Sequence, residues 1–381
     1  MANDTSGTHN PGCQGTVHCL ISGLEDAGYE VMSRIAIGYG YPLFQNLLEE
    51  IRPNDLLGKL AFRLDHSRRL KKLGSWIFGA SKAPQYRVSF SAWNISVSKT
   101  ERELALLKGD TEWLVVNGEG TIHDNTIGAL TLLGLCKAAR QLGMKVAIVN
   151  CSIFNLDSVL LDELKLLDYI AVREPLSFSY LRAHGIKVHQ AADCLFLAKG
   201  HPVSEVGLKN ISINEQEKYV VYTPGVLAGS RHFDKEKMLD EIKSITAEGY
   251  TVYYYVVERE DEKYIPEVER AGAKVIDVGT ISWQELHGFL GRSQFVVSGR
   301  YHIVIFSILA GVPFFSKRTN TEKIDGLLEL LGISLNSKFA AKPDVDWSEL
   351  SAQGPYIIDQ LKINECSSLA KKCCELLPYN Q

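Results

Sequence analysis

Two kinds of apolar segment alternate along most of the chain. Short runs of β-branched and aromatic residues, such as residues 113–117 and 295–297, are typical of strands buried on both faces. Longer segments carry apolar residues three and four positions apart, which is typical of helices. Strands are predicted at residues 29–37, 113–117, 146–149, 169–172, 188–192, 219–222, 251–257, 275–278 and 295–297, and helices at residues 17–28, 43–51, 100–108, 127–141, 156–166, 176–183, 233–248, 264–271, 282–290, 323–331 and 356–377. This alternation predicts an α/β protein with parallel sheets.

The apolar pattern lapses between residues 200 and 217, where Gly, Pro, Ser, Asn and Glu predominate. Such a composition favours an irregular linker. We therefore predict two doubly wound, Rossmann-like domains facing a cleft, formed by residues 1–205 and 215–340. The final helical segment, within residues 355–381, is expected to pack back on the first domain. A chain of 381 residues is long enough for two full-sized cores.

Composition and charge exclude several classes of protein. Hydrophobic residues make up 45% and charged residues 23%, which is ordinary for a globular protein. The formal net charge of −4 gives no reason to expect a nucleic-acid partner. No apolar run approaches about 18 residues, and no signal peptide is visible at the N-terminus. The eight cysteines form no CxxC pair, so we expect reduced thiols in a cytoplasmic protein.

Motifs for common cofactors are absent from the sequence. Neither GxGxxG nor GxxxxGK[ST] occurs, so dinucleotide and P-loop chemistry are not predicted. The ten histidines are dispersed, and no metal site is predicted. A basic cluster at residues 63–72 fits a solvated helix face or a mobile loop, or else a lid or a contact with an acceptor or a membrane surface, and the sequence leaves these alternatives open.

Polar side chains directly follow several predicted strands. Residues 117–119 and 150–152 follow two of them, and Arg173 with Glu174 follows a third. The carboxyl ends of parallel strands meet at one edge of a sheet, where ligands bind in open α/β folds. Turn chemistry and helix capping are the alternatives at each position. Arg173 is the most informative, because a buried guanidinium needs an anionic partner.

A second set of polar residues follows the strand at residues 295–297. Arg300, Tyr301 and His302 fall where the next helix begins, and that helix is apolar nearly all round. A helix N-terminus offers free N–H groups and the positive end of its dipole to an anion. Packing requires neither an arginine nor a histidine here. We predict an anion-binding, proton-handling site at these three residues.

Five short motifs together resemble one enzyme family. They are NPG at residues 10–12, NGEGTIHD at 117–124, VREPLS at 172–177, AD at 192–193 and RYH at 300–302, ahead of GVP at 311–313. In this order they resemble the polysaccharide pyruvyl transferases over most of residues 4–316. The resemblance implies a two-domain fold similar to GT-B glycosyltransferases. It departs from the family at Tyr301, where the family has Leu, and at Cys13 and Gln14, where the family has an acidic pair.

The resemblance also implies a reaction and roles for these residues. The enolpyruvyl group of phosphoenolpyruvate would be transferred to two hydroxyls of a sugar, with release of phosphate and formation of a pyruvate ketal. Arg173 and Arg300 would bind the phosphate and carboxylate across the cleft, and His302 would transfer protons. The catalytic candidates are His302, Arg300, Glu119 and Glu174, the two glutamates either orienting the histidine or accepting a hydroxyl proton, with Asp193 as a further candidate. The substrate-binding candidates are Arg173, Arg300, Tyr301, Asn10, Gly12, Asn117, Gly118 and Ser152.

The resemblance implies no cofactor beyond phosphoenolpyruvate as donor substrate. It implies a sugar acceptor from a cell-surface polysaccharide or its lipid-linked precursor, with peripheral contact at the inner face of the cytoplasmic membrane. A GT-B glycosyltransferase using a nucleotide sugar is one alternative, and a non-catalytic anion- or glycan-binding protein is another. Thermal stabilisation by phosphoenolpyruvate but not by nucleotide sugars would separate these functions.

Overall fold

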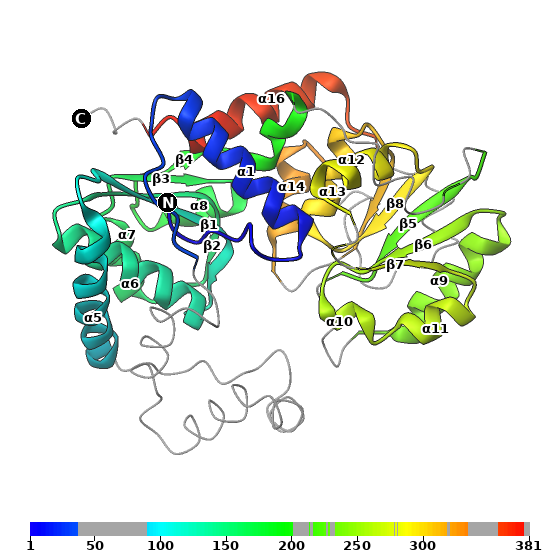
Figure 1. The fold of residues 1–381 in the computed structure, drawn as a ribbon, viewed down its shortest axis with the longest axis horizontal. Coiled ribbons are helices and arrows are strands. Elements are labelled where there is room, and N and C mark those ends of the chain that lie inside the picture. Colours follow the sequence, from blue (N-terminus) through cyan, green and yellow to red (C-terminus); the bar gives the residue numbers. More distant parts are fainter. Residues whose placement is uncertain are drawn as a thin grey trace, which may run out of the picture. The chain divides into compact units, whose positions relative to one another are not determined.

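A computed structural model of the chain describes residues 1–36, 90–200, 216–225, 233–277, 281–317, 321–333 and 357–376, with the single residues 213, 228 and 279. The chain forms two compact units, whose elements are labelled in Figure 1. Unit one consists of Met1–Thr5, Leu24–Ala191 and Lys372–Gln381. Unit two consists of Ser6–Gly23 and Ala192–Lys371. Each unit contains one parallel sheet, which confirms the predicted α/β class.

Unit one contains a sheet of four strands in the order β1-β2-β3-β4. The strands are β1 (Trp113–His123), β2 (Lys145–Phe154), β3 (Tyr169–Val172) and β4 (His189–Gln190). The N-terminus adds to this sheet through Ala2, which forms parallel bridges with Val116 and with Ile35. The strand predicted at residues 29–37 is thus reduced, within its described part, to the single bridge at Ile35.

The helices of unit one are α5 (Phe90–Lys108), α6 (Ile127–Gln141), α7 (Ser158–Leu164) and α8 (Pro175–Ala183). Helix α6 begins after Thr126, whose hydroxyl accepts a hydrogen bond from the Ala129 amide. Its small and apolar residues, among them Leu130, Leu133 and Ala138, are fully buried in the core of the unit. The small-residue pattern of this segment therefore serves close packing on the sheet.

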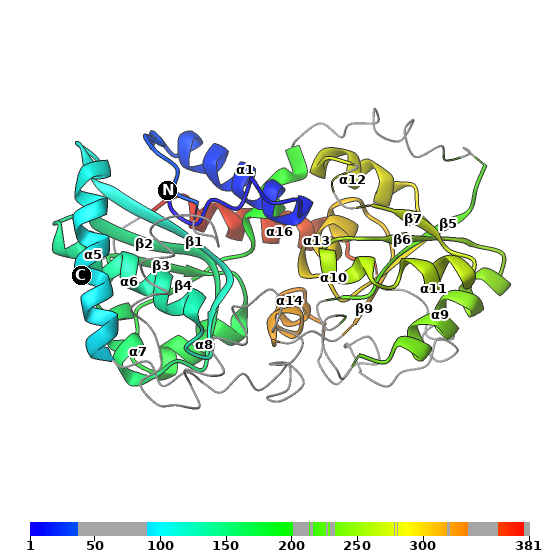
Figure 2. The same ribbon diagram turned by 60° about the horizontal axis from the view of Figure 1, so that its bottom comes forward.

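Unit two contains a sheet of five parallel strands in the order β7-β6-β5-β8-β9. The strands are β5 (Tyr219–Thr223), β6 (Thr251–Tyr255), β7 (Lys274–Ile276), β8 (Phe295–Ser298) and β9 (Phe314–Ser316). Helices α9 (Lys235–Ala247) and α11 (Ile265–Arg270) cover one face, and α12 (Trp283–Gly291) and α13 (Tyr301–Leu309) cover the other (Figure 2). The remaining elements of the chain are α1 (Pro11–Asp26), 3₁₀ helix η1 (Cys194–Gly200), α10 (Arg259–Glu262), α14 (Lys323–Leu330), α16 (Gln360–Ala370) and 3₁₀ helix η4 (Lys371–Cys373).

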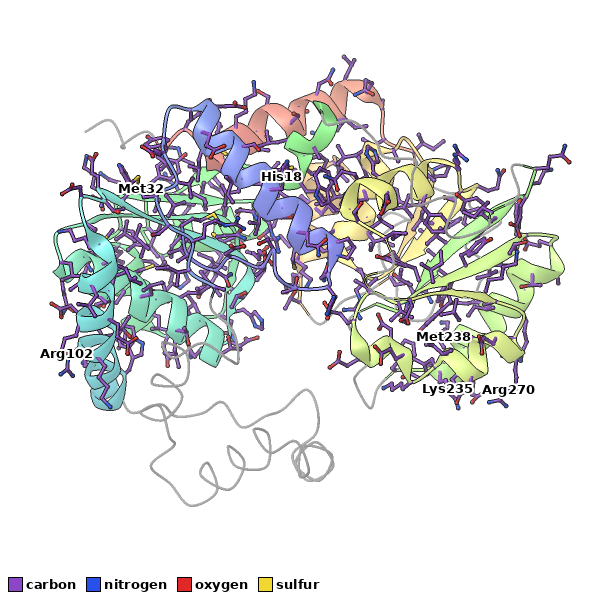
Figure 3. The ribbon with its side chains drawn as sticks, in the orientation of Figure 1. His18, Met32, Arg102, Lys235, Met238 and Arg270 are labelled. Atoms are coloured by element: carbon purple, nitrogen blue, oxygen red, sulfur yellow. The ribbon has the colours of Figure 1, made fainter. Side chains whose placement is uncertain are left out.

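One hydrophobic cluster of unit two lies between its sheet and α9. Met238 of α9 is buried with Ile242 against Val220 and Tyr222 of β5, whereas Arg270 of α11 is exposed (Figure 3). Burial of apolar side chains toward the sheet and exposure of charged ones is typical of helices that cover a sheet. The sheet is therefore a rigid base for the loops at its carboxyl edge.

The division into units differs from the predicted domains at both ends of the chain. Helix α1 belongs to unit two as far as Gly23, and α16 belongs to unit two as well. Helix α1 belongs to unit two because it packs closely on it: a side chain at Gly15 would touch Leu195 and Phe306 of that unit. The main part of the predicted linker, residues 201–212, and the basic cluster at residues 63–72 lie outside the described residues. No helix in the described part of the chain is long and apolar enough to cross a membrane.

Candidate active site

The site in unit two begins where β8 ends. Ser298 closes the strand, and its hydroxyl accepts a hydrogen bond from the Arg300 amide at 2.9 Å. Arg300 then forms the N-cap of α13, and Tyr301 and His302 lie in its first turn. Across from this turn, Gly225 has a φ of 87° and lies so close that a Cβ atom there would be 2.9 Å from the Gly299 Cα. Two glycines thus let two loops at the carboxyl edge of the sheet approach each other closely.

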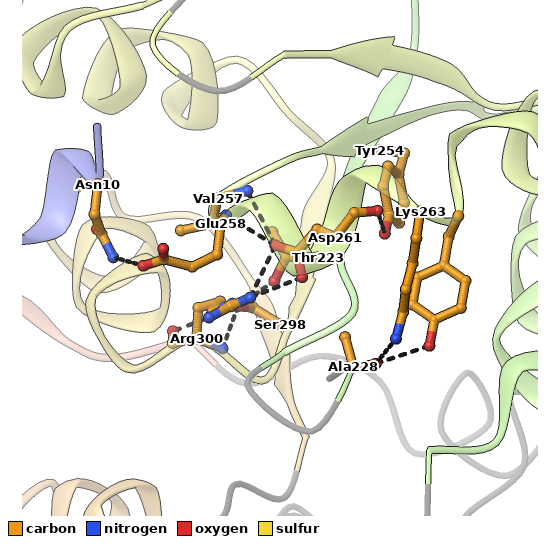
Figure 4. Close-up of polar contacts among 11 residues, drawn as sticks. Asn10, Thr223, Ala228, Tyr254, Val257, Glu258, Asp261, Lys263, Ser298 and Arg300 are labelled. Carbon is orange, nitrogen blue, oxygen red and sulfur yellow. Dashed lines mark hydrogen bonds and ion pairs between the residues drawn. The ribbon is translucent and has the colours of Figure 1, made fainter. Parts of the chain in front are cut away.

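Arg300 pairs with a buried aspartate that the sequence analysis missed. Its Nη2 donates to both carboxylate oxygens of Asp261, at 2.7 and 2.9 Å (Figure 4). The Asp261 side chain is 0% exposed and that of Arg300 is 11% exposed. Asp261 also accepts hydrogen bonds from the amides of Val257 and Glu258, each at 3.1 Å. Burial raises the pKa of Asp261, and the Arg300 guanidinium and the two amides oppose that shift.

The same network reaches the start of α1. Glu258 accepts a hydrogen bond from the Asn10 side-chain amide at 2.8 Å, as Figure 4 shows. The Asn10 carbonyl oxygen accepts from the Gly12 amide at 2.9 Å, so Asn10 caps α1 and Pro11 occupies its first position. The capping motif explains why Asn10 and Pro11 stand together. Asn10 is thereby linked to Glu258, whose backbone amide donates to the Asp261 carboxylate that holds Arg300.

His302 lies between α1 and the segment that precedes η1. Its Nε2 is 3.6 Å from a carboxylate oxygen of Asp193 and 3.4 Å from the hydroxyl of Thr16. The Asp193 side chain is 0% exposed and that of His302 is 13% exposed. Gly12 lies directly against the ring, and a Cβ at this position would overlap the His302 Cβ and Nδ1. The ring of Tyr301 packs edge-on, with centroids 5.4 Å apart.

Unit one holds the other predicted charged residues. Arg173 is 1% exposed, and its Nε donates to the Ser152 hydroxyl at 2.9 Å. Glu174 is fully buried and caps α8, accepting from the amide of Ser177 at 2.9 Å and also from its hydroxyl. Burial raises the pKa of Glu174 to about 7, although Ser177 and Arg173 act in the opposite direction. A carboxyl group titrating near neutrality is a candidate for proton transfer as well as a cap.

The predicted strand boundaries in unit one are wrong in an informative way. β1 runs to His123 and β2 to Phe154, so residues 117–119 and 150–152 lie inside strands rather than after them. Asn150 donates to the Asn117 side chain at 2.9 Å, and Asn117 donates to Glu119 at 3.0 Å. These internal bonds, and positive φ values at Glu119 and Asn150, let the strands continue past polar residues. Gly118 has a packing reason, since a Cβ there would overlap the Cys151 side chain.

The structure sorts the predicted residues into two groups. Asn10, Gly12, Arg300, Tyr301 and His302 come together in unit two, and Asn117, Gly118, Glu119, Ser152, Arg173 and Glu174 lie in unit one. The neighbours of His302 are Asp193 and Thr16, whereas Glu119 and Glu174 were the predicted partners.

Sequence reasoning missed Asp261, Glu258 and Thr16. Residues 258–261 come shortly after the strand β6, separated from it by Val256 and Val257, so the rule that polar residues mark the carboxyl ends of strands could have found two of them. Thr16 carried no such signal. Within the described residues, no group of three or more His, Cys, Asp or Glu is arranged to hold a metal ion.

Two parallel α/β sheets, each with buried charged residues near its strands, place the chain in the class of two-domain, GT-B-like proteins. Its fold is similar to that of a UDP-N-acetylglucosamine 2-epimerase crystal structure, with a TM-score of 0.51, 14% identity, and coverage of 94% of this chain and 88% of the other. It is also similar to S. aureus MnaA with UDP, with a TM-score of 0.51, 13% identity, and coverage of 96% and 88%. The UDP-N-acetylglucosamine 2-epimerase from Rickettsia bellii has a TM-score of 0.50 and 9% identity, with coverage of 95% and 92%. At these identities the similarity shows the fold alone.

The family is shown by the sequence itself. The family model of polysaccharide pyruvyl transferase matches residues 84–320, more than half of the chain, and the chain belongs to this family. No curated protein sequence matches the chain significantly. The matched region contains Arg173, Glu174, Arg300 and His302.

Proposed function

We propose that this protein transfers the enolpyruvyl group of phosphoenolpyruvate to a sugar of a cell-surface polysaccharide or of its lipid-linked precursor. Membership of the polysaccharide pyruvyl transferase family supports a transferase acting on such sugars. The observation that carries the proposal is the start of α13, where an oriented arginine and a histidine with a buried carboxylate neighbour are two residues apart. The arginine can donate hydrogen bonds to an anion and the histidine can transfer protons, as binding and conversion of phosphoenolpyruvate would require.

The reaction needs three tasks from the protein. A proton must reach the methylene carbon C3 of phosphoenolpyruvate while a sugar hydroxyl oxygen bonds to C2. The bond from C2 to the phosphate oxygen must then break, and a second hydroxyl must bond to C2 to close the ketal. The two hydroxyl protons must leave. We assign proton transfer to His302, because histidine gains and loses protons near neutrality.

We assign Arg300 to binding the anionic groups of phosphoenolpyruvate. Its ion pair with Asp261 defines how it would bind them. Asp261 neutralises its charge, so the guanidinium acts as a fixed hydrogen-bond donor rather than as a free cation. Its Nε is buried and has no hydrogen-bond partner among the described residues. A buried N–H without a partner is costly, and an anionic oxygen of the substrate would satisfy it. Tyr301, Asn10 and Gly12 are assigned to the same binding region.

In unit one we assign anion binding to Arg173 and Ser152, with Asn117 and Gly118 as further binding residues. The buried guanidinium and its hydroxyl partner support this assignment. Glu174 and Glu119 are assigned to proton acceptance from a hydroxyl. The raised pKa of Glu174 supports such a role for that residue.

The proposal also covers the acceptor and the place where the protein acts. A lipid-linked acceptor would place the protein at the inner face of the cytoplasmic membrane, and the basic residues in the sequence at 63–72 are candidates for binding anionic lipid. Flotation with vesicles of phosphatidylglycerol and phosphatidylcholine tests this contact. Binding that persists after all five basic residues of the cluster are replaced by Gln would contradict it.

The central test is phosphate release from phosphoenolpyruvate with a panel of sugar acceptors. We expect phosphate and a pyruvate ketal in equal amounts, and a loss of roughly 10²- to 10⁴-fold in kcat for His302→Ala, because general acid–base groups contribute that much. His184→Ala is the matched control, since this histidine is exposed and lies in unit one. Full activity of a folded His302→Ala variant would overturn the assignment.

Thermal shift measurements separate the alternative donors. Phosphoenolpyruvate should raise the melting temperature, and UDP-, GDP- and CMP-sugars should not. The opposite pattern would favour a glycosyltransferase. Stabilisation by phosphoenolpyruvate, with no ketal formed on any acceptor, would favour a binding protein without turnover.

A further inference from the structure

Asp193 and Thr16 surround one nitrogen of the His302 ring. Asp193 Oδ2 is 3.6 Å from Nε2 and Thr16 Oγ1 is 3.4 Å from it. Asp193 and Thr16 are both 0% exposed. The ring therefore presents Nε2 to the interior of unit two. The other nitrogen, Nδ1, lies beside Gly12 and has no hydrogen bond to the described residues.

The Asp193 carboxylate is itself held in place. Its Oδ1 accepts a hydrogen bond from the Leu195 amide at 2.9 Å and lies 3.5 Å from the Thr16 hydroxyl. Oδ2 is the oxygen nearer the histidine, at 3.6 Å from Nε2. A carboxylate accepts hydrogen bonds and cannot donate one, so it favours the ring form that carries a hydrogen on Nε2. The same logic governs histidines that are oriented by a carboxylate in metal sites and catalytic triads.

From this arrangement we infer that Asp193 is a positioning residue, which fixes a hydrogen on Nε2 of His302 and so makes Nδ1 the nitrogen that exchanges protons with the substrate. Thr16 supports the same orientation from α1. Asp193 is the charged group that faces the ring in this arrangement, because Arg300, two residues before His302, is directed to Asp261. The inference rests on the proposed function and adds to it the reacting atom.

The proton and electron movements balance with Nδ1 in this role. In the first step the Nδ1–H bond of the protonated ring breaks as the C3–H bond forms, the acceptor oxygen bonds to C2, and the hydroxyl proton passes to the carboxylate assigned to accept it. In the second step the bond from C2 to the phosphate oxygen breaks, and phosphate leaves with the electron pair. The second hydroxyl oxygen bonds to C2 and its proton returns to Nδ1. Throughout, Nε2 keeps its hydrogen toward Asp193.

Gly12 gives this inference an independent structural basis. A side chain there would occupy the space beside Nδ1 and would displace the ring. Gly12 belongs to the first turn of α1 and has no positive φ, so backbone strain does not explain a glycine at this position. The requirement is the close approach of α1 to the His302 side chain, including the proposed reacting nitrogen.

The first experiment reads the ring itself and needs no substrate. In full-length protein with ¹⁵N-labelled histidine, the neutral His302 ring of wild type should carry its hydrogen on Nε2. Asp193→Asn can donate its amide N–H to Nε2 and should move the hydrogen to Nδ1, as replacing the carboxylate of a triad does. A wild-type ring with its hydrogen on Nδ1, or no change in Asp193→Asn, would overturn the inference whatever the enzyme's substrate is.

The second experiment measures phosphate release. We expect Asp193→Asn to lower kcat by roughly 10²- to 10⁴-fold, because the proton-transfer group is misoriented. KM for phosphoenolpyruvate should change less than about threefold, because the residues that bind the anion are intact. Thr16→Val should lower kcat by about tenfold, and Thr16→Ser, which keeps the hydroxyl, should restore it. An equal loss in the Val and Ser variants would show that Thr16 serves packing only and would refute its part in the inference.

The two experiments also separate failure of the inference from failure of the proposed function. If wild type releases no phosphate from phosphoenolpyruvate with any acceptor, the proposed function fails, and the ring measurement still decides the role of Asp193. If wild type is active and Asp193→Asn keeps full kcat, the positioning role fails and the function stands.

Discussion

The buried pair of Asp261 and Arg300 allows a quantitative prediction. Asp261→Asn keeps the size of the side chain but removes its charge and one of its two acceptor oxygens. The guanidinium, only 11% exposed, would then lack its counter-charge. Removing one partner of a buried ion pair costs about 3–5 kcal/mol, because the remaining charge is left uncompensated. We expect the free energy of unfolding of unit two to fall by that amount.

A double-mutant cycle isolates the interaction from other effects of substitution. Arg300→Met should cost a similar amount, and the double variant should cost less than the sum by about 2 kcal/mol, since contacting residues are coupled. Scanning calorimetry gives the stability of each variant, fitted with separate transitions for the two units. Hydrogen exchange at the amides of Val257 and Glu258, which donate to Asp261, adds a local measurement.

An exposed pair in the same unit provides the control. Lys243 and Asp240 are 3.1 Å apart, with side chains 59% and 73% exposed. Exposed pairs contribute about 0–1 kcal/mol, so Asp240→Asn should be nearly neutral. The reasoning fails if Asp261→Asn is as mild as Asp240→Asn, or if the coupling with Arg300 is under about 0.5 kcal/mol.

Three further predictions follow from the same structure. Gly12→Ala should lower kcat at least about tenfold by displacing His302. Gly7→Ala is the control and should be neutral, because the space around a Cβ at this position is open. Equal rates of phosphate release by the two variants would contradict the close contact between Gly12 and His302. The folded pKa of Glu174, about 7, lies above its ordinary value of 4.5, so its contribution to stability is fully present below pH 4.5 and is lost as pH rises through 7. By calorimetry, the free energy of unfolding of wild type should fall by on the order of 3 kcal/mol over that range, and that of Glu174→Gln should not. Parallel plots of unfolding free energy against pH for the two proteins would refute this. Asn10→Ala removes the cap of α1 and the bond to Glu258 and should cost about 1 kcal/mol in urea unfolding, while an unchanged midpoint would show that the cap contributes nothing.

The sequence predicted the structure best where a short apolar run is followed directly by polar residues. The strands near residues 169–172, 219–222 and 295–297 and the start of α13 lie where the alternation predicted them, because buried parallel strands need β-branched and aromatic residues. Prediction failed at Asn117 and Asn150, because polar residues inside a strand look like its end. Their amides bond to each other across neighbouring strands, and a contact between residues 33 apart in sequence leaves no local pattern.

The candidate site shows the same limit. The RYH motif located Arg300 and His302, but the groups that hold them come from far along the chain. Asp261 is 39 residues from Arg300, and Thr16 is 286 residues from His302. The structure shows that Asp261 also takes part in the capping of α10. From sequence alone, that role would be a sufficient explanation for an aspartate at this position, so its ion pair with Arg300 would not be suspected. Burial decides between such readings, and one sequence alone does not reveal burial.

The composition of unit two from two distant segments has a consequence for how the protein is made. Thr16 and Gly12 leave the ribosome first, whereas His302 and the strands beside it appear almost three hundred residues later. Residues Leu24–Ala191, the main part of unit one, are therefore synthesised before the N-terminal segment can complete unit two. A truncation that removes α1 would therefore remove Gly12 and Thr16, two of the residues that surround His302.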